Sequence, residues 1–95
     1  MIIGAVTLKL NISFARSLKD KRMTVKSIIA KARNKFNISI SETDALDMIQ
    51  TAVISIAFIA ANSALADSIA ENVISFIENN TDAEVLADAR TFSEP

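Results

Sequence analysis

The chain has 95 residues, with 51% hydrophobic and 22% charged side chains and a net charge of −1. This size and composition are those of one folded domain with a single modest core, and they exclude a disordered chain. The absence of cysteine and histidine excludes disulfides, thiol nucleophiles, imidazole acid–base chemistry and the usual structural zinc sites.

The first 36 residues predict a long strand followed by a helix. Apolar and polar side chains alternate over residues 2–14, which is typical of a strand with one buried face, and Phe14 is its last inward residue. From Ser17 the apolar spacing becomes helical, and Ser17 and Asp20 have the spacing of a capping box. The expected apolar stripe of this helix is Leu18, Arg22, Val25, Ile29, Ala32 and Phe36.

The remaining residues predict two strands, a helix and a last strand. Residues 37–43 and 49–60 alternate again, and the inward set of the longer strand is Ala52, Ile54, Ile56 and Phe58. Asn62 or Ser63 caps a second helix that ends at Asn79-Asn80. Its expected apolar stripe is Leu65, Ile69, Val73, Phe76 and Ile77. Residues 83–92 form the last strand.

The element order βαββαβ predicts an α+β fold of the ferredoxin-like type. Right-handed crossovers place both helices on one face of a four-stranded antiparallel sheet with strand order 4-1-3-2. We expect a single domain over residues 1–92 and a short tail over residues 93–95. Phe14, Phe36, Phe58 and Phe76 should all be buried between the helices and the sheet.

The other face of the predicted sheet lacks aromatic side chains on which RNA bases could stack, so the fold is not an RRM-type platform. This open face is small and mildly apolar. It is either a partly hydrated surface or the interface of a homodimer, formed through Val53, Ala57 and Ile59.

The charges are sorted along the chain in a way that the small net charge conceals. Residues 1–36 hold nine Lys or Arg and one Asp, whereas residues 37–95 hold one Arg and ten acidic residues. One interpretation is a bipolar surface whose basic pole meets a polyanion. The other is that the two halves fold against each other and neutralise.

The segment RSLKDKR, residues 16–22, places four cations at the start of the first predicted helix. Positive charge is unfavourable there because the helix dipole is positive at its N-terminus. One hypothesis is an anion or RNA site that uses Arg16, Lys19, Lys21, Arg22, Lys26 and Arg33. The alternative is a set of rim salt bridges, in which Lys19, Lys21 or Arg22 pairs with acids of the hairpin between the second and third strands.

The acids of that hairpin are Glu42, Asp44 and Asp47. Carboxylates can bind Mg²⁺ or Ca²⁺ or act as acid and base, but this cluster lacks an EF-hand pattern and a glycine turn. The single glycine, Gly4, also rules out a glycine-rich phosphate loop. We therefore assign no metal, no cofactor and no catalytic residue, and we expect a protein that is not an enzyme.

Three segments resemble the YlxP-like family of small bacterial proteins of unknown function. They are SLKDKR at residues 17–22, RNKFNISI at residues 33–40, and the spacing of Glu42, Asp47 and Gln50 before an apolar strand. The resemblance implies a ferredoxin-like fold and a genomic association with translation and ribosome-maturation genes, and it implies no catalytic residues. Ile49 and Thr51 stand where Trp and Arg are common in that family, so aromatic stacking is not expected at this position.

Two functional hypotheses follow. The first is a noncatalytic protein that contacts RNA or a ribosomal particle through its basic first helix. The second is a homo-oligomeric structural or adaptor module without a role in nucleic-acid binding.

The longest apolar run, residues 52–61, is shorter than the roughly 20 residues that span a bilayer, and the N-terminus lacks the basic region of a signal peptide. We therefore expect no membrane partner and a cytoplasmic location.

Overall fold

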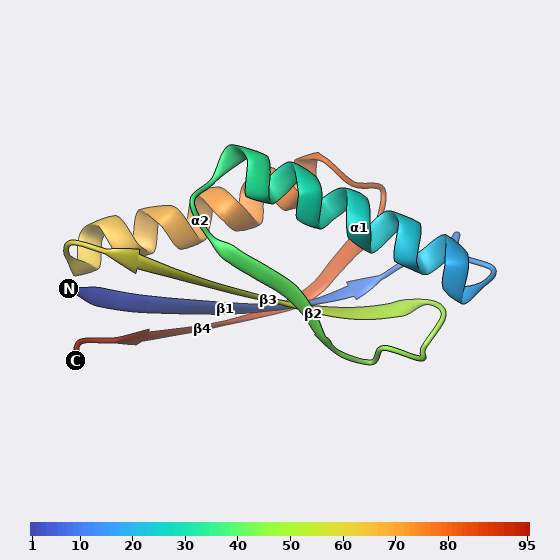
Figure 1. Ribbon diagram of the computed structural model, residues 1–95, viewed down its shortest axis with the longest axis horizontal. Coiled ribbons are helices and arrows are strands. Elements are labelled where there is room, and N and C mark those ends of the chain that lie inside the picture. The colour runs from blue at the N-terminus through green and yellow to red at the C-terminus, as the bar shows by residue number, and fades with distance from the viewer.

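The computed structural model describes residues 1–95 and contains six elements in βαββαβ order. These are β1 (Ile2–Asn11), α1 (Leu18–Lys35), β2 (Ser39–Asp44), β3 (Thr51–Ala60), α2 (Ser63–Asn79) and β4 (Glu84–Ser93). The strands form one antiparallel sheet in the order β2-β3-β1-β4. Both helices lie on the same face of the sheet (Figure 1). The predicted ferredoxin-like fold and the strand order 4-1-3-2, read from the other edge, are confirmed.

The core lies between the helices and the inner face of β1 and β3. These two strands pair along their whole length, from Ile2 opposite Ala60 to Asn11 opposite Thr51. Buried and exposed residues alternate along both strands, as the sequence pattern predicts for a sheet with one covered face. The inward set predicted for β3 is confirmed, since Ala52, Ile54, Ile56 and Phe58 are all buried.

Gly4 occupies a position of β1 where a side chain has no space. It lies directly opposite Phe58 of β3 and Phe92 of β4 on the helix-facing side of the sheet. A Cβ atom at Gly4 would lie 2.6 Å from Cε2 and 2.9 Å from Cε1 of the Phe58 ring. The Phe58 ring therefore covers the glycine and fills the space that its missing side chain leaves.

The start of α1 is formed as the capping pattern predicts. Ser17 is the N-cap, and its hydroxyl accepts a hydrogen bond from the Asp20 backbone N–H at 3.1 Å. The Asp20 carboxylate accepts in return from the Arg16 backbone N–H at 3.0 Å. This carboxylate also places a negative charge in the first turn, where the helix dipole favours it.

The buried face of α1 differs from the predicted stripe. It consists of Lys21, Val25, Ile28 and Ala32, whereas Arg22 is exposed and Ile29 is only partly buried. The prediction was wrong at two positions, because the helix turns the neighbouring Lys21 and Ile28 toward the sheet in place of Arg22 and Ile29. The face itself has ordinary helical spacing of four, three and four residues.

The buried face of α2 also differs from the prediction. Asn62 is the N-cap, and its side chain accepts from the Leu65 N–H at 2.9 Å. The residues that face the sheet are Ala66, Ala70, Val73, Ile74 and Ile77. Leu65 is 45% exposed, so its expected place in the core was wrong. Alanines at two of the five buried positions allow the start of the helix to approach the sheet closely.

The four phenylalanines expected in the core have different environments. Phe58 is buried, whereas Phe36 and Phe76 are partly buried and form an edge-to-face pair with ring centroids 5.5 Å apart. Phe14 is 49% exposed, which contradicts the prediction. The reason is that β1 ends at Asn11 and the chain then turns, with the Ala15 N–H donating to the Ile12 carbonyl at 3.0 Å.

The molecule is elongated, with principal extents of 42 × 21 × 18 Å. Both chain termini lie at one end, and the start of α1 and the β2–β3 loop lie together at the other end (Figure 1). The edge strand β4 is tied to α2 by Arg90, whose guanidinium donates to Glu71 at 2.8 Å and to Asp88 at 3.1 Å. These hydrogen bonds, that to Glu71 first, raise the pKa of Arg90.

Candidate nucleic-acid interface on the first helix

Lys21 is fully buried in spite of its charge, because its position lies on the face of α1 that packs against the sheet. Its Nζ donates hydrogen bonds to the carbonyl oxygens of Ala45 at 2.6 Å and Leu46 at 3.4 Å. The same Nζ lies 2.9 Å from Glu42 Oε2, in an ion pair whose side chains are 0% and 15% exposed. Glu42 Oε2 has no donor aligned for a hydrogen bond, so the contact is electrostatic. Lys21 therefore anchors the β2–β3 loop and does not face solvent.

Of the rim salt bridges that the sequence suggests, Lys21 to Glu42 is the one that forms. Asp44 Oδ1 accepts instead from the Ala45 N–H at 2.7 Å, and Asp47 forms no salt bridge. No group of three or more acidic side chains is placed to hold a metal ion. Apart from Glu42, the acids of this hairpin therefore form no salt bridge with the cations of α1.

Three of the predicted site residues gather along one flank of α1. Lys19, Arg22 and Lys26 are exposed and form no salt bridge. They line an open groove of about 590 Å³ between α1 and β2, whose apolar lining residues are Met23, Val25, Ile29 and Leu46. Glu42, the one acid in this groove, is neutralised by Lys21. The groove therefore combines an aliphatic surface with three free positive charges.

The other predicted cations lie apart from this group. Arg33 is on the same flank about two turns beyond Lys26, and its Nη2 donates to the Ile40 carbonyl at 3.1 Å. Arg16 precedes the helix and lines a separate hollow with Met48 and Ile49. The structure thus brings together Lys19, Arg22 and Lys26, places Arg33 in line with them, and separates Arg16 and the buried Lys21.

The charge separation seen in the sequence persists on the folded surface. Helix α1 carries seven Lys or Arg and one Asp, whereas α2 carries three acids and no cation. One hydrogen bond links α1 to the end of α2: Lys31 Nζ donates to the carbonyl group of Asn80, the residue after α2, at 3.3 Å. Lys21 to Glu42 is the one salt bridge that joins a cation of residues 1–36 to an acid of the remaining chain. Neutralisation between the halves is therefore slight.

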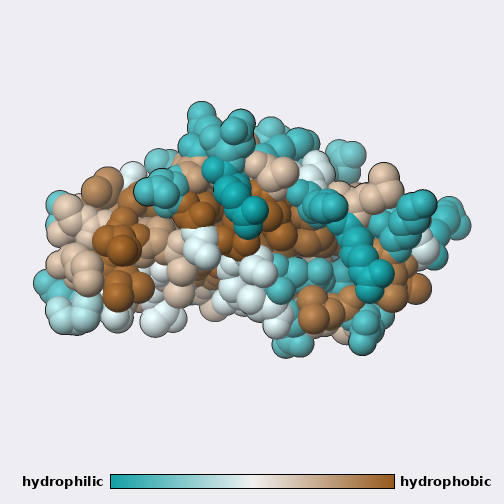
Figure 2. All heavy atoms as spheres, in the orientation of Figure 1, coloured by the Kyte–Doolittle hydropathy of each residue, from teal (hydrophilic) through white to brown (hydrophobic).

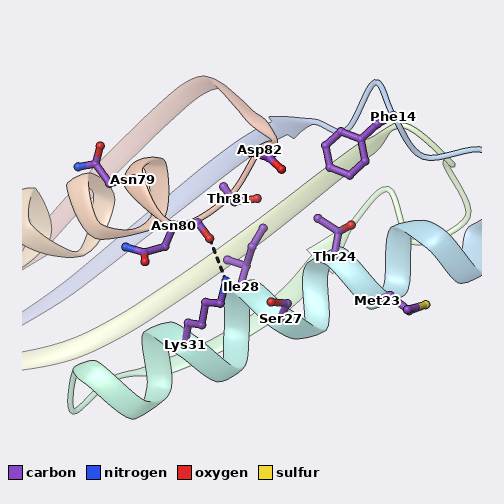
Figure 3. Close-up of a pocket in the computed structure, with 10 residues that line it drawn as sticks. All are labelled: Phe14, Met23, Thr24, Ser27, Ile28, Lys31, Asn79, Asn80, Thr81 and Asp82. Atoms are coloured by element: carbon purple, nitrogen blue, oxygen red, sulfur yellow. Dashed lines mark hydrogen bonds between the residues drawn. The ribbon is translucent and has the colours of Figure 1, made fainter.

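A second groove, which the sequence did not predict, lies on the opposite flank of α1. It has a volume of about 490 Å³ and is lined mainly by polar residues of α1 and of the segment after α2. Phe14 stands at its edge, and Lys31 reaches across it to Asn80 (Figure 3). No sequence signal pointed to it, because its shape depends on the turn that exposes Phe14.

The open face of the sheet is almost free of charge in its centre. Strand β3 has no charged residue and β1 has only Lys9, which lies on this face opposite Val53. The Ser55 hydroxyl forms hydrogen bonds with the hydroxyl groups of Thr43, at 2.6 Å, and of Thr7, at 3.5 Å. Ile3 and Ile59 lie opposite each other at one end and are 40% and 68% exposed.

Neither helix is both long and apolar enough to cross a membrane.

The fold and the surface together define a ferredoxin-like α+β protein with a cationic first helix. Residues 3–90 match the model of the DUF503 family, described as protein of unknown function, and the chain belongs to this family. It is 32% identical over 83 residues to "Uncharacterized protein YlxP" of Bacillus subtilis (strain 168), a match that covers 87% of this chain and 90% of that relative. The resemblance drawn from the three sequence segments is confirmed.

Proposed function

We propose that this protein is a noncatalytic, cytoplasmic RNA-binding protein that uses α1 to contact RNA or a ribosomal particle. The observation that carries the proposal is the row of unpaired cations on one flank of α1, formed by Lys19, Arg22 and Lys26 and continued by Arg33. Cations that are free of salt bridges are available to neutralise phosphates and to release counterions, which is the main source of affinity in phosphate recognition.

RNA is the polyanion to test first, because the family resemblance implies an association with translation genes. The chemistry of the groove suggests how RNA would be bound. The apolar groove residues are Met23, Val25, Ile29 and Leu46, and the groove has no aromatic ring on which a base could stack. We therefore expect contacts to the phosphate backbone with little sequence preference.

Fluorescence anisotropy with a labelled RNA hairpin at about 50 mM salt tests the proposal, since electrostatic binding is strongest at low salt. Lys26→Glu should weaken binding several-fold. Lys9→Glu is the matched control, because it makes the same change in charge at an exposed lysine on the opposite face of the sheet. Equal losses in the two variants would indicate a nonspecific effect of net charge, and no binding by the wild type would reject the proposal.

A second candidate function is that of a homo-oligomeric structural or adaptor module. The uncharged centre of the open sheet face and the exposed pair Ile3 and Ile59 support it, because an apolar sheet face without partners favours association with a second copy. This candidate uses the face opposite to α1, so the two functions are compatible and can be tested separately.

A further inference from the structure

The β2–β3 loop, residues 45–50, is held in place by side-chain hydrogen bonds at both of its ends. The buried Lys21 binds the carbonyl groups of Ala45 and Leu46. At the other end of the loop, Gln50 Nε2 donates to the carbonyl groups of Ser13 and Ala15 at 3.0 and 3.1 Å. Ala45 has a φ of 56°, which is unusual for a residue with a Cβ atom. The loop therefore has a defined shape that does not depend on packing of its apolar side chains.

Those apolar side chains point to solvent. Leu46, Met48 and Ile49 are 54%, 53% and 42% exposed, and Met23 of α1, which shares a groove with Leu46, is 63% exposed. We call these four residues the apolar tip. In the space-filling view, hydrophobic atoms are visible at the end of the molecule where Figure 1 places the loop (Figure 2). Large apolar side chains gathered on an ordered surface are typical of a site that binds another molecule.

Positive charge borders the apolar tip on the side of α1. Lys19 and Arg22 line the groove that contains Leu46, whereas the hollow that contains Met48 and Ile49 is lined by one cation, Arg16, and one acid, Asp47. None of these three cations forms a salt bridge. The partner that complements this surface has apolar side chains flanked by carboxylates.

We propose that the apolar tip docks an acidic amphipathic helix of a partner protein. Its apolar residues would cover Met23 and Leu46, and its carboxylates would pair with Lys19 and Arg22. A groove of about 590 Å³ has the size that receives a few side chains spaced by one helical turn. The preformed loop lowers the ordering cost of binding. RNA would use Lys19 and Arg22 as well, but the aliphatic side chains of the tip provide no stacking surface for bases.

The test is an NMR titration of the isotope-labelled full chain with two synthetic peptides of about 16 residues, long enough to form helix. The first peptide has leucines along one helical face and glutamates elsewhere. The second has the same composition with the leucines scattered around the helix. We expect shifts at residues 19–23 and 46–49 with the first peptide, and affinity about tenfold weaker with the second.

Two variants show whether the tip is the binding site. Leu46→Ser should weaken binding of the first peptide about tenfold, a change that corresponds to one buried anchor side chain. Leu65→Ser is the matched control, because it is the same substitution at a leucine that is 45% exposed and lies in the first turn of α2, outside the apolar tip and the open sheet face. It should leave the affinity unchanged. Both positions are exposed, so both variants should keep the fold and the remaining spectrum.

Several results would overturn the proposal. They are shifts at residues other than 19–23 and 46–49, equal affinity for the two peptides, no binding of the first peptide at about 1 mM, the weak end of specific recognition, or unchanged affinity of Leu46→Ser. Anionic phosphatidylglycerol vesicles should not sediment the protein. If they do, and Leu46→Ser abolishes it, the tip contacts lipid and the assignment to a protein helix is wrong.

Discussion

Replacing Lys21 by methionine should destabilise the protein strongly, although the change turns a charged residue into an apolar one inside the core. Methionine keeps the unbranched shape of the lysine side chain but removes its charge and its three donors. The carbonyl groups of Ala45 and Leu46 then lose their donor, and Glu42, only 15% exposed, keeps a carboxylate without its cation.

The size of the effect follows from this geometry. Removing one partner of a buried ion pair costs about 3–5 kcal/mol, because the other charge stays in a poorly solvated place. Glu42 retains some contact with water, so we expect a loss of about 3 kcal/mol in the free energy of unfolding. In a domain of this size, about 1 kcal/mol corresponds to roughly 4–8 °C in Tm. The melting temperature of Lys21→Met should therefore fall by more than about 10 °C.

Urea and thermal unfolding followed by circular dichroism measure this loss. Lys26→Met is the matched control, since the same substitution at an exposed site on the same helix should change stability by no more than about 0.5 kcal/mol. Adding Glu42→Gln to Lys21→Met should recover part of the loss by removing the unpaired charge. If Lys21→Met is as stable as Lys26→Met, Lys21 does not form the buried anchor described above.

Three further predictions concern the core and the open face. Phe58→Ala should cost about 3–5 kcal/mol in denaturant unfolding, whereas Phe14→Ala should cost much less because Phe14 is half exposed; similar losses would contradict these placements. Gly4→Ala should destabilise by about 1–3 kcal/mol, and a stable variant would show that the Phe58 ring does not cover Gly4. Ile59→Lys should convert a dimer into a monomer in light scattering, and a wild type that is monomeric at high concentration would remove the idea of self-association.

The strands were the most predictable part of the fold. A sheet with one covered face requires alternation of apolar and polar residues, and β1 and β3 follow this rule along their whole length. The same alternation also led to a wrong prediction for one residue, because it continues in the sequence beyond the end of β1. Phe14 fits the pattern of β1, but the chain turns after Asn11, and nothing in the residue types marks that point.

The helices were predicted by their caps more reliably than by their buried faces. Ser17 and Asn62 mark their starts correctly. The buried faces were wrong in part, because Lys21 and Ile28 of α1 face the sheet in place of Arg22 and Ile29, and Ala66 and Ala70 of α2 face it in place of Leu65 and Ile69. The spacing of positions 21, 25, 28 and 32 was a usable signal for the buried lysine, since three of these positions hold apolar residues.

The candidate interface was only partly predictable. The common flank of Lys19, Arg22, Lys26 and Arg33 follows from helical periodicity, and the structure places them along one side of α1. The sequence could not show which of these cations form salt bridges, because salt-bridge formation depends on the bulge between Glu42 and Asp44 and on the shape of the β2–β3 loop. For the same reason, the apolar tip could not be predicted from residue types alone.

The salt dependence of RNA binding tests the proposed function most directly. If Lys19, Arg22, Lys26 and Arg33 each neutralise one phosphate, the slope of log affinity against log salt should be near −2.8 on single-stranded RNA, at about −0.7 per contact. Arg22→Glu with Lys26→Glu should reduce the magnitude of the slope to about half and leave the free energy of unfolding within about 0.5 kcal/mol. Arg33 is left intact because it bonds to Ile40. An unchanged slope in the double variant, or a wild type that ignores RNA at about 50 mM salt, would contradict the account.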